Sequence, residues 1–451
     1  MWTVNSESGT LHAVLIQDTT RNFWENKLPF AGSEANLQYL PRCPHAHYDA
    51  GGHEQWLKLE QFLKEEGVQV FEVTSILKKA IDRASETERR DIIKKFWDEN
   101  ARAPSPETLS VEHLTDGYPP TPIYDEANDQ VILPDFKRAS WTYTRDTSLT
   151  TQFGTVICNM RRYSRLMEPK VVKLAYESDP TLNENVNIIW DANDIRLAST
   201  EPPNIEGGDT EIIDEETIAV GIGQRSTFTG FSEFAKRLFA ADSSKKLKHI
   251  CAVYLADYPA LDYMHLDVVI NFPANRKALI MPYCFESEIV KDMPPKKLLL
   301  KLLTATRAQS ERDARPMQDV VAPSAFAKAG QCFVYMRGEQ NEPVFQRCEV
   351  SLIDFLIKED KLDKDGLIYV AGEPRQKNDI NHLMLALMEQ ARGATNIITV
   401  KSGNVISYAR TTATIEALQQ HGIRVKKWDD SYLDMLGGPH CSTAPLFRDP
   451  N

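Results

Sequence analysis

The pattern of apolar and polar positions predicts an α/β unit near the N-terminus. Residues 11–18 form a short apolar run typical of a strand. Residues 53–66 then carry apolar side chains near helical spacing, and residues 68–73 form a second apolar strand. Gly67, between the helix and this strand, is typical of a helix C-terminus. The order strand, helix, strand is that of alternating α/β proteins.

A unit of the same layout recurs near the C-terminus. Residues 396–400 and 405–408 are predicted to be a pair of strands, residues 411–420 a helix, and residues 422–425 the next strand. The repetition lies in the order of the elements and not in their letters. The chain therefore has one α/β layout at both ends.

A helical and loop-rich insert is predicted at residues 76–134. Residues 76–100 are strongly charged and carry apolar side chains at helical spacing. The stretch that follows, up to Pro134, is rich in proline and predicts loops. Residues 296–309 predict another helix, which we interpret as a core helix of an acidic protein rather than a membrane-surface helix.

Composition and charge exclude several classes of protein. Apolar residues make up 42% and charged residues 26%, which is typical of a globular protein. The 52 Lys and Arg against 64 Asp and Glu give a net charge of −12, which argues against a nucleic-acid-binding surface. No apolar run reaches the ~18 residues that span a bilayer, and the first residues lack a signal-peptide pattern. We expect a cytoplasmic protein without a membrane or nucleic-acid partner.

The cofactor motifs in the chain are weak. Residues 218–223 (IAVGIG) resemble the start of a dinucleotide site, but Ser226 stands where a third glycine is needed. No P-loop occurs, and the seven cysteines include no C-x-x-C pair. A metal site is an alternative only at a cluster whose spacing is unusual for zinc: Cys43, His45, His47 and His53. We therefore expect no metal and no organic cofactor.

Four short segments carry the candidate chemistry. They are Tyr-Thr-Arg-Asp at residues 143–146, Asn-Ile-Glu-Gly-Gly-Asp at 204–209, Met-His-Leu-Asp at 264–267 and Gly-Gly-Pro-His-Cys-Ser-Thr at 437–443. Taken singly, each also fits a surface loop, a tight turn, a strand edge or a buried thiol. Together they supply a thiol in a glycine-rich loop, a histidine and several carboxylates. This set suits covalent attack on a cationic electrophile.

In this order the four segments resemble those of the arginine deiminase family, a member of the guanidino-group-modifying superfamily. The resemblance extends from Ser6-Glu7-Ser8-Gly9 to residues 444–450. It implies the pentein fold, a pseudo-fivefold α/β propeller of ββαβ units with a helical insert. It also implies a single catalytic domain over residues 1–451.

The resemblance implies a role for each residue that matches the family's motifs. Cys441 matches the nucleophile and His265 the general acid and base. Asp146 and Asp267 match the carboxylates that grip the guanidinium, and Glu206 matches the one that pairs with the histidine and the substrate. The chemistry is reasonable because two carboxylates hold a delocalised guanidinium in place and fix the direction of attack.

The predicted substrate-binding residues lie around this catalytic set. Arg165 and Arg225 match the arginines that bind the substrate's α-carboxylate, which suits the planar guanidinium fork. Asp209, Ser140 and Gly438 complete the predicted substrate-binding residues. Ser140 and Leu436 depart from the family, which usually has Asn and a gating Arg there. These departures bear on which substrate is recognised more than on the reaction.

We therefore predict an arginine-deiminase-type hydrolase. It would convert L-arginine, or a close derivative, to L-citrulline or the corresponding ureido product and ammonia through a cysteine thiouronium intermediate. The alternatives are an amidinotransferase, an arginine dihydrolase and a non-catalytic pentein binding protein. The sequence leaves open the ionisation of the resting thiol and the oligomeric state, a homo-oligomer included.

Overall fold

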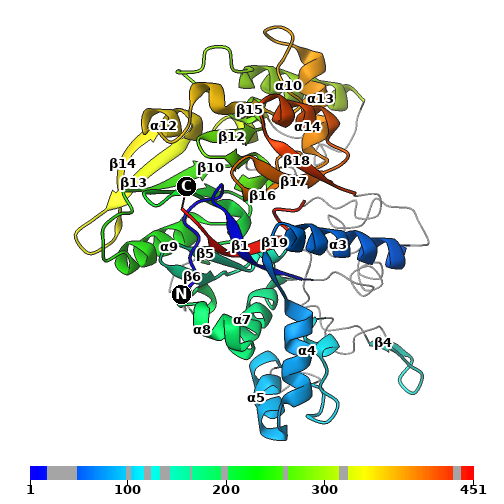
Figure 1. The fold of residues 1–451 in the computed structure, drawn as a ribbon. Helices are drawn as coiled ribbons and strands as arrows, with labels where there is room; N and C mark the ends of the chain where they lie inside the picture. The colour runs from blue at the N-terminus through cyan, green and yellow to red at the C-terminus, as the bar shows by residue number, and fades with distance from the viewer. Residues whose placement is uncertain are drawn as a thin grey trace.

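The computed structural model describes residues 1–17, 48–97, 103–115, 123–132, 143–162, 165–194, 202–256, 263–313, 323–429 and 438–450. Five sheets of these residues repeat one pairing scheme (Figure 1). In each, a central strand pairs antiparallel with one neighbour and parallel with the other. The parallel neighbour requires a crossover, which contains a helix in each sheet. We call the three strands that follow this scheme, together with their crossover, a unit. The five ββαβ units confirm the predicted α/β class.

Units 1 and 5 contain the elements that the sequence predicted at the two ends of the chain. Unit 1 consists of β19 (Thr443–Arg448), β1 (Leu11–Ile16), α3 (Tyr48–Glu65) and β2 (Gln69–Glu72). Unit 5 consists of β16 (Ile398–Lys401), β17 (Asn404–Tyr408), α14 (Thr412–Gln420) and β18 (Arg424–Trp428). Gly67 follows α3 at a φ of +83°, the left-handed conformation expected after a helix end. Helix α3 begins earlier than the predicted residue 53.

Units 2 and 3 contain their strands and helices in the same order along the chain. Unit 2 consists of β5 (Ser148–Thr151), β6 (Gly154–Ile157), α7 (Glu168–Ser178), α8 (Pro180–Asn185) and β7 (Ile188–Asp191). Unit 3 consists of β8 (Thr210–Asp214), β9 (Thr217–Ile222), α9 (Phe228–Ala241) and β10 (His249–Tyr254). The apolar run at residues 218–223 is thus the central strand of unit 3, which explains its hydrophobicity without a dinucleotide site.

Unit 4 has the longest crossover, and part of that crossover extends the sheet of unit 3. Its strands are β11 (Ile270–Ala274), β12 (Lys277–Ile280) and β15 (Leu367–Tyr369). The crossover contains α10 (Lys296–Arg312), α11 (Pro323–Phe326), β13 (Cys332–Arg337), β14 (Pro343–Glu349) and α12 (Leu352–Lys358). Strand β13 pairs with β10, so the hairpin β13–β14 lengthens the neighbouring sheet. Helix α13 (Ile380–Gln390) leads to unit 5.

The ends of the chain meet in unit 1. Strand β19 near the C-terminus lies antiparallel beside β1 near the N-terminus, and the two strands run together through the middle of the molecule (Figure 1). Unit 1 therefore takes its first strand from the opposite end of the chain. Cys441 therefore lies two residues before the first strand of unit 1.

The residues between unit 1 and unit 2 are mainly helical where they are described. They contain α4 (Val73–Arg83), α5 (Glu86–Phe96), α6 (Val111–Thr115), β3 (Ile123–Asp125) and β4 (Gln130–Ile132). Helices α4 and α5 project at one end of the molecule (Figure 1). A capping box between Ser85 and Glu88 starts α5 and separates it from α4. The division into a single domain with an insert at residues 76–134 stays a prediction.

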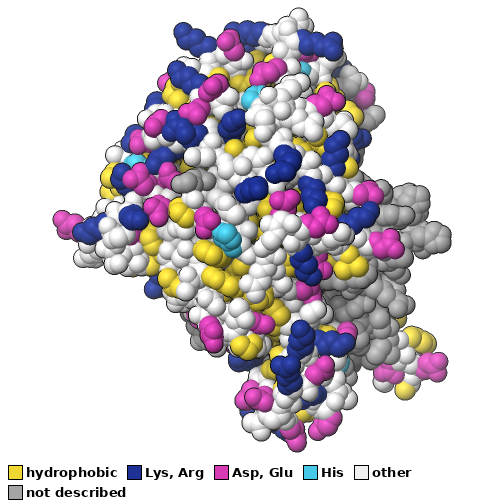
Figure 2. All heavy atoms as spheres, in the orientation of Figure 1, with side chains coloured by type: hydrophobic (Ala, Val, Ile, Leu, Met, Phe, Trp, Pro, Cys, Tyr) yellow, Lys and Arg dark blue, Asp and Glu magenta, His cyan; other side chains and the backbone are white. Residues whose placement is uncertain are grey.

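The hydrophobic core lies between the sheets and the helices that cover them. In unit 3, Phe231, Phe234 and Leu238 of α9 pack in one buried cluster with Ile218 and Ile250 of the sheet. No helix in the described ranges is both long and apolar enough to span a bilayer. Basic and acidic side chains are interspersed over the face shown in Figure 2.

Candidate active site

The candidate site is built from the short segments that precede the first strands of the units. Asp146 ends η2 (Thr144–Asp146) before β5, and Asp209 ends η5 (Gly207–Asp209) before β8. Asp267 lies in η7 (Leu266–Val268) before β11, with His265 at its start. Cys441 precedes β19. All of these side chains are buried, so the repeated fold brings together residues that are far apart in the sequence.

His265 forms an ion pair with Glu206 and lies near a second carboxylate. Its Nε2 is 2.9 Å from Glu206 Oε2, and its Nδ1 is 3.7 Å from Asp146 Oδ1. Burial lowers the imidazole pKa, but the charges of Asp146, Asp209 and Glu206 outweigh it and raise the pKa to about 10. His265 therefore carries a proton at neutral pH and is ready to act as an acid.

Glu206 is held in its ionised form. Burial raises its pKa, but Arg225, the hydrogen bond with His265 and Arg165 together lower it to about 2. Its second oxygen accepts a 2.8 Å hydrogen bond from the backbone N–H of Arg161. A carboxylate fixed in this way keeps the His265 ring in one orientation.

Cys441 is a buried thiol that donates to Asp267. Its Sγ lies 3.2 Å from Asp267 Oδ2. Burial, together with the charges of Asp267 and Asp146, raises the thiol pKa well above its usual value. The ligand-free arrangement thus favours a protonated resting thiol, a question that the sequence left open.

Asp267 is shared by several donors on one oxygen only. Its Oδ2 accepts hydrogen bonds from Cys441, from Asn396 Nδ2 at 3.1 Å and from His440 Nδ1 at 2.8 Å. Among the described residues, Oδ1 has no hydrogen-bond partner although it is buried. A buried acceptor without a donor costs free energy, so this oxygen is well suited to receive an N–H of a bound cation.

Asp146 is paired with a buried arginine. Arg165 Nη1 lies 2.7 Å from Asp146 Oδ2, and the other side of the Arg165 guanidinium makes a bidentate pair with Glu168. The remaining oxygen of Asp146 accepts the backbone N–H of Gly208 at 3.1 Å. Most of the Arg165 donors are therefore used within the protein. Its predicted role in binding an α-carboxylate stays a prediction, and Glu168 would compete with that group.

Arg225 and Asp209 both interact electrostatically with Glu206. Arg225 Nη1 is 3.9 Å from Glu206 Oε2, and its Nη2 donates to Met264 Sδ at 3.4 Å. Asp209 Oδ2 accepts a 3.0 Å hydrogen bond from the backbone N–H of Ser226. Burial raises the pKa of Asp209 to about 7. Both residues border the His265–Glu206 pair. Their roles in substrate binding stay predictions.

Gly208, the second glycine of the Glu-Gly-Gly-Asp segment, permits the close approach of Asp146 and His265. A Cβ at Gly208 would lie 2.7 Å from Asp146 Oδ1 and 2.8 Å from His265 Nδ1. We expect Gly208→Ala to lower kcat by at least about ten-fold because it displaces both side chains. Steady-state kinetics with a thermal melt measures this.

Gly207→Ala is the comparison for that variant. A Cβ at Gly207 would lie 2.0 Å from the backbone oxygen of Arg145. Because backbone atoms cannot move aside as a side chain can, we expect Gly207→Ala to lower Tm, whereas Gly208→Ala lowers kcat. Wild-type kcat in Gly208→Ala would show that Asp146 and His265 need not be held so closely.

Several predicted positions fall outside the described residues. Ser140, Leu436 and Gly437 are among them, as are three members of the alternative metal cluster, Cys43, His45 and His47. The side chain of the fourth member, His53, is also not described. Gly438 is described, and its backbone N–H donates to Asn396 Oδ1 at 2.7 Å. These assignments stay predictions.

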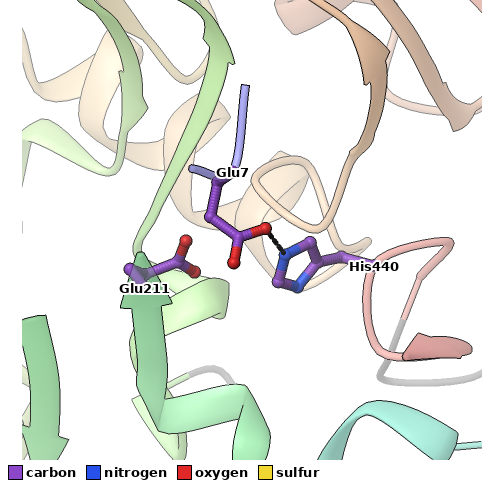
Figure 3. Close-up of side chains that lie close together, drawn as sticks. All are labelled: Glu7, Glu211 and His440. Atoms are coloured by element: carbon purple, nitrogen blue, oxygen red, sulfur yellow. Dashed lines mark ion pairs between the residues drawn. The ribbon is translucent and has the colours of Figure 1, made fainter. Parts of the chain in front are cut away.

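A second buried cluster lies next to the nucleophile and includes His440, which contacts Asp267. Glu7, Glu211 and His440 approach one another there, with an ion pair between Glu7 and His440 (Figure 3). In the described part of the chain, neither carboxylate oxygen of Glu211 has a hydrogen-bond partner. Burial and the charge of Glu7 raise the pKa of Glu211 well above its usual value. The protonated form of Glu211 is therefore favoured more than in a free carboxyl group.

In the portion of the chain that is described, two groups have the spacing of metal ligands, Glu7–Glu211–His440 and Asp146–Glu206–His265. In each, a buried guanidinium already faces a carboxylate: Arg145 lies 3.4 Å from Glu7, and Arg165 lies 2.7 Å from Asp146. These arginines supply the positive charge that a metal ion would otherwise bring. The donor sets therefore do not require a metal.

Sequence reasoning missed some residues that complete the site. Glu168 was not singled out, and Asn396 was interpreted only as the start of a strand. Strand β16 in fact begins at Ile398, and the side chain of Asn396 contacts Cys441. The spacing Arg165-x-x-Glu168, in which Arg165 lies three residues before the first residue of α7, was the available signal for the first.

The family model described as arginine deiminase matches residues 123–312 and 320–448. Arginine deiminase of Listeria monocytogenes serotype 4b (strain CLIP80459) is 23% identical over 308 residues, 68% of this chain and 61% of that protein. The alignment thus spans about three fifths of the Listeria protein. Arginine deiminase 1 of Staphylococcus epidermidis (strain ATCC 12228 / FDA PCI 1200) is 21% identical over 478 residues, 99% of this chain and 98% of that protein.

Solved structures show a likeness in fold. SxtG, an amidinotransferase from Microseira wollei in the saxitoxin biosynthetic pathway, matches with a TM-score of 0.53 and 12% identity. The match covers 100% of this chain and 98% of that one. At this identity the similarity concerns the fold alone, and it confirms the pentein fold that the sequence predicted.

Proposed function

Because the chain belongs to the arginine deiminase family, we propose that it hydrolyses the guanidinium group of L-arginine, or of a close arginine derivative. The products would be L-citrulline, or the corresponding ureido compound, and ammonia. The observation that carries this proposal is the buried set of Cys441, Asp267 and the His265–Glu206 ion pair, in which Asp267 Oδ1 has no hydrogen-bond partner within the described ranges. These groups supply a nucleophile, a cation-binding carboxylate and an acid within one site.

The charges of the site favour a cationic substrate. The carboxylates of Asp146, Glu206 and Asp267 are all buried. A guanidinium placed against Asp267 Oδ1 would donate a hydrogen bond to this oxygen, which the described part of the chain leaves without a donor. Its positive charge would also lower the pKa of the Cys441 thiol, whose high value comes from burial and then from Asp267 and Asp146. Substrate binding and formation of the thiolate are thereby linked.

The chemistry then proceeds through a covalent adduct. As the cationic substrate binds, the Cys441 thiol loses its proton to solvent, where it is later taken up by the released ammonia. The thiolate attacks the guanidinium carbon, and His265, protonated at neutral pH, transfers its proton to the departing ammonia as the C–N bond breaks. The neutral imidazole next takes a proton from the water that attacks the thiouronium carbon. Cleavage of the C–S bond releases the ureido product and restores the thiol. Glu206 keeps the imidazole oriented through both steps.

An assay of ammonia, ureido product and ornithine tests this proposal against its rivals. Purified protein is incubated with L-arginine, agmatine and methylated arginines, each with and without an added amine. Ammonia and ureido product without the amine support the hydrolase. Dependence on the amine would indicate an amidinotransferase, and ornithine would indicate a dihydrolase. No product from any substrate would favour a binding protein.

Agmatine tests how the substrate's α-carboxylate is recognised. If Arg225 binds that carboxylate, agmatine should show a kcat/KM lower than that of arginine by a factor of about thirty or more. Arg225→Gln should then reduce kcat/KM for arginine more than for agmatine, because agmatine has no carboxylate to lose. Equal turnover of both substrates would remove the carboxylate role from Arg225 and from Arg165.

A further inference from the structure

Four of the five units contribute a proposed catalytic side chain from the segment before their first strand. Asp146 lies two residues before β5, and Cys441 lies two residues before β19. Units 3 and 4 contribute Glu206 and His265 from the corresponding segments. In unit 5 the residue two positions before β16 is Asn396, which is fully buried. The repeat of the fold thus points to Asn396 as the contribution of the fifth unit.

Every hydrogen-bonding group of the Asn396 side chain is used at the nucleophile. Its Oδ1 accepts the backbone N–H groups of Gly438 at 2.7 Å and of Cys441 at 2.9 Å. Its Nδ2 donates to Cys441 Sγ at 2.9 Å and to Asp267 Oδ2 at 3.1 Å. Two backbone donors on one atom define which end of the amide is oxygen, so the NH₂ group must face the sulfur.

These contacts do two separate things. The oxygen holds the backbone of the nucleophile segment, and the NH₂ group holds the sulfur beside Asp267. The charged groups that face the thiol most strongly are Asp267 and Asp146, and both raise its pKa, as does burial. The hydrogen bond from Asn396 acts in the opposite direction and lowers the thiol pKa. A donor to sulfur favours the thiolate because the bond is stronger when its acceptor is charged.

We propose that Asn396 is a positioning residue that directs the Cys441 sulfur toward the cation bound at Asp267 and stabilises its thiolate. The expected effect of Asn396 on turnover rests on the proposed function. The contact between Asn396 and the sulfur is independent of that function and can be tested without a substrate. The two ideas can therefore fail separately.

Asn396→Asp is the decisive variant. Asp has the same shape and can still accept both backbone N–H groups, but it replaces the donor to sulfur with a carboxylate. Loss of a charge-assisted bond corresponds to about one to two pKa units, so alkylation of Cys441 by iodoacetamide at pH 8 should slow at least about ten-fold. With substrate, kcat should fall by at least about ten-fold, and KM should change by less than about three-fold.

The controls use other residues of the same chain. Alkylation is followed by peptide mass spectrometry, and the exposed Cys348 serves as an internal reference in each sample. Asn404→Ala removes a buried Asn whose side chain donates to Glu66 in unit 1, away from the sulfur, and should alkylate like the wild type. Asn396→Ala removes the donor without adding charge and gives a second reading if Asn396→Asp is unstable. A melting curve confirms folding for each variant.

The outcomes separate the alternatives. Slow Cys441 alkylation in both Asn396 variants, with Cys348 unchanged, supports the proposal even if no guanidino substrate is turned over. In that case the proposed function fails alone. Wild-type alkylation rates and wild-type kcat in folded Asn396→Asp would show that Asn396 only holds the backbone of the nucleophile segment. This result would overturn the proposal.

Discussion

Cys441→Ser should lose at least about 10⁴-fold in product formation while keeping its fold. Removal of the nucleophile eliminates the whole covalent pathway, which costs more than the loss of a single contact. Serine occupies nearly the same volume, and the backbone N–H of residue 441 can still donate to Asn396. A hydroxyl, however, ionises far less readily than a thiol in a site that already opposes ionisation by burial and by Asp267. Ammonia release, melting temperature and far-UV circular dichroism measure the two sides of this prediction.

The covalent intermediate gives a more direct test of the same residue. Wild-type protein quenched in acid during turnover should show a mass increase on the peptide that contains Cys441, and Cys441→Ser should show none. Cys348→Ser is the matched control, because Cys348 is an exposed thiol outside the site. Its activity should equal that of the wild type. Substantial turnover by Cys441→Ser would exclude the covalent route.

His265→Gln should lower kcat by about 10²- to 10⁴-fold, with a much smaller change in KM. The reason is that its imidazolium supplies the proton to the departing ammonia, whereas Gln keeps a polar side chain that can contact Glu206 but cannot transfer a proton. Pre-steady-state kinetics should show slow formation of the adduct. An increase in KM alone would indicate that His265 only binds the substrate.

The pH dependence of stability tests the same charge network without catalysis. The pKa of His265 is raised from 6.5 to about 10, so the folded state binds its proton more tightly than the unfolded state. This stabilisation is fully present below pH 6.5 and is lost as the pH rises through about 10. The free energy of unfolding should therefore decline more steeply between these values in the wild type than in His265→Gln. Parallel curves would show that the carboxylates do not hold this proton.

The sequence by itself determined the local elements and the chemical groups. Hydrophobic spacing and Gly67 were sufficient to predict β1, α3 and β2, because these elements depend on their own side-chain periodicity and on one helix end. The four motif segments identified a thiol, an imidazole and carboxylates. Residues 396–400 were predicted as a strand, but β16 begins at Ile398, because the side chain of Asn396 is used in contacts with Cys441 and Asp267.

Only the tertiary structure decided how these groups act on one another. No local pattern shows that β19 closes unit 1 against β1, which brings Cys441 beside Asp267 from the far end of the chain. Contacts between residues so distant in sequence depend on the packing of all five units. The pKa values follow from the same packing. Neighbouring carboxylates raise the pKa of His265 to about 10 against the opposing effect of burial, and burial together with Asp267 and Asp146 raises the pKa of Cys441 well above its usual value. The role of Asn396 was equally hidden, since its amide meets the sulfur only when the fifth unit packs against the first.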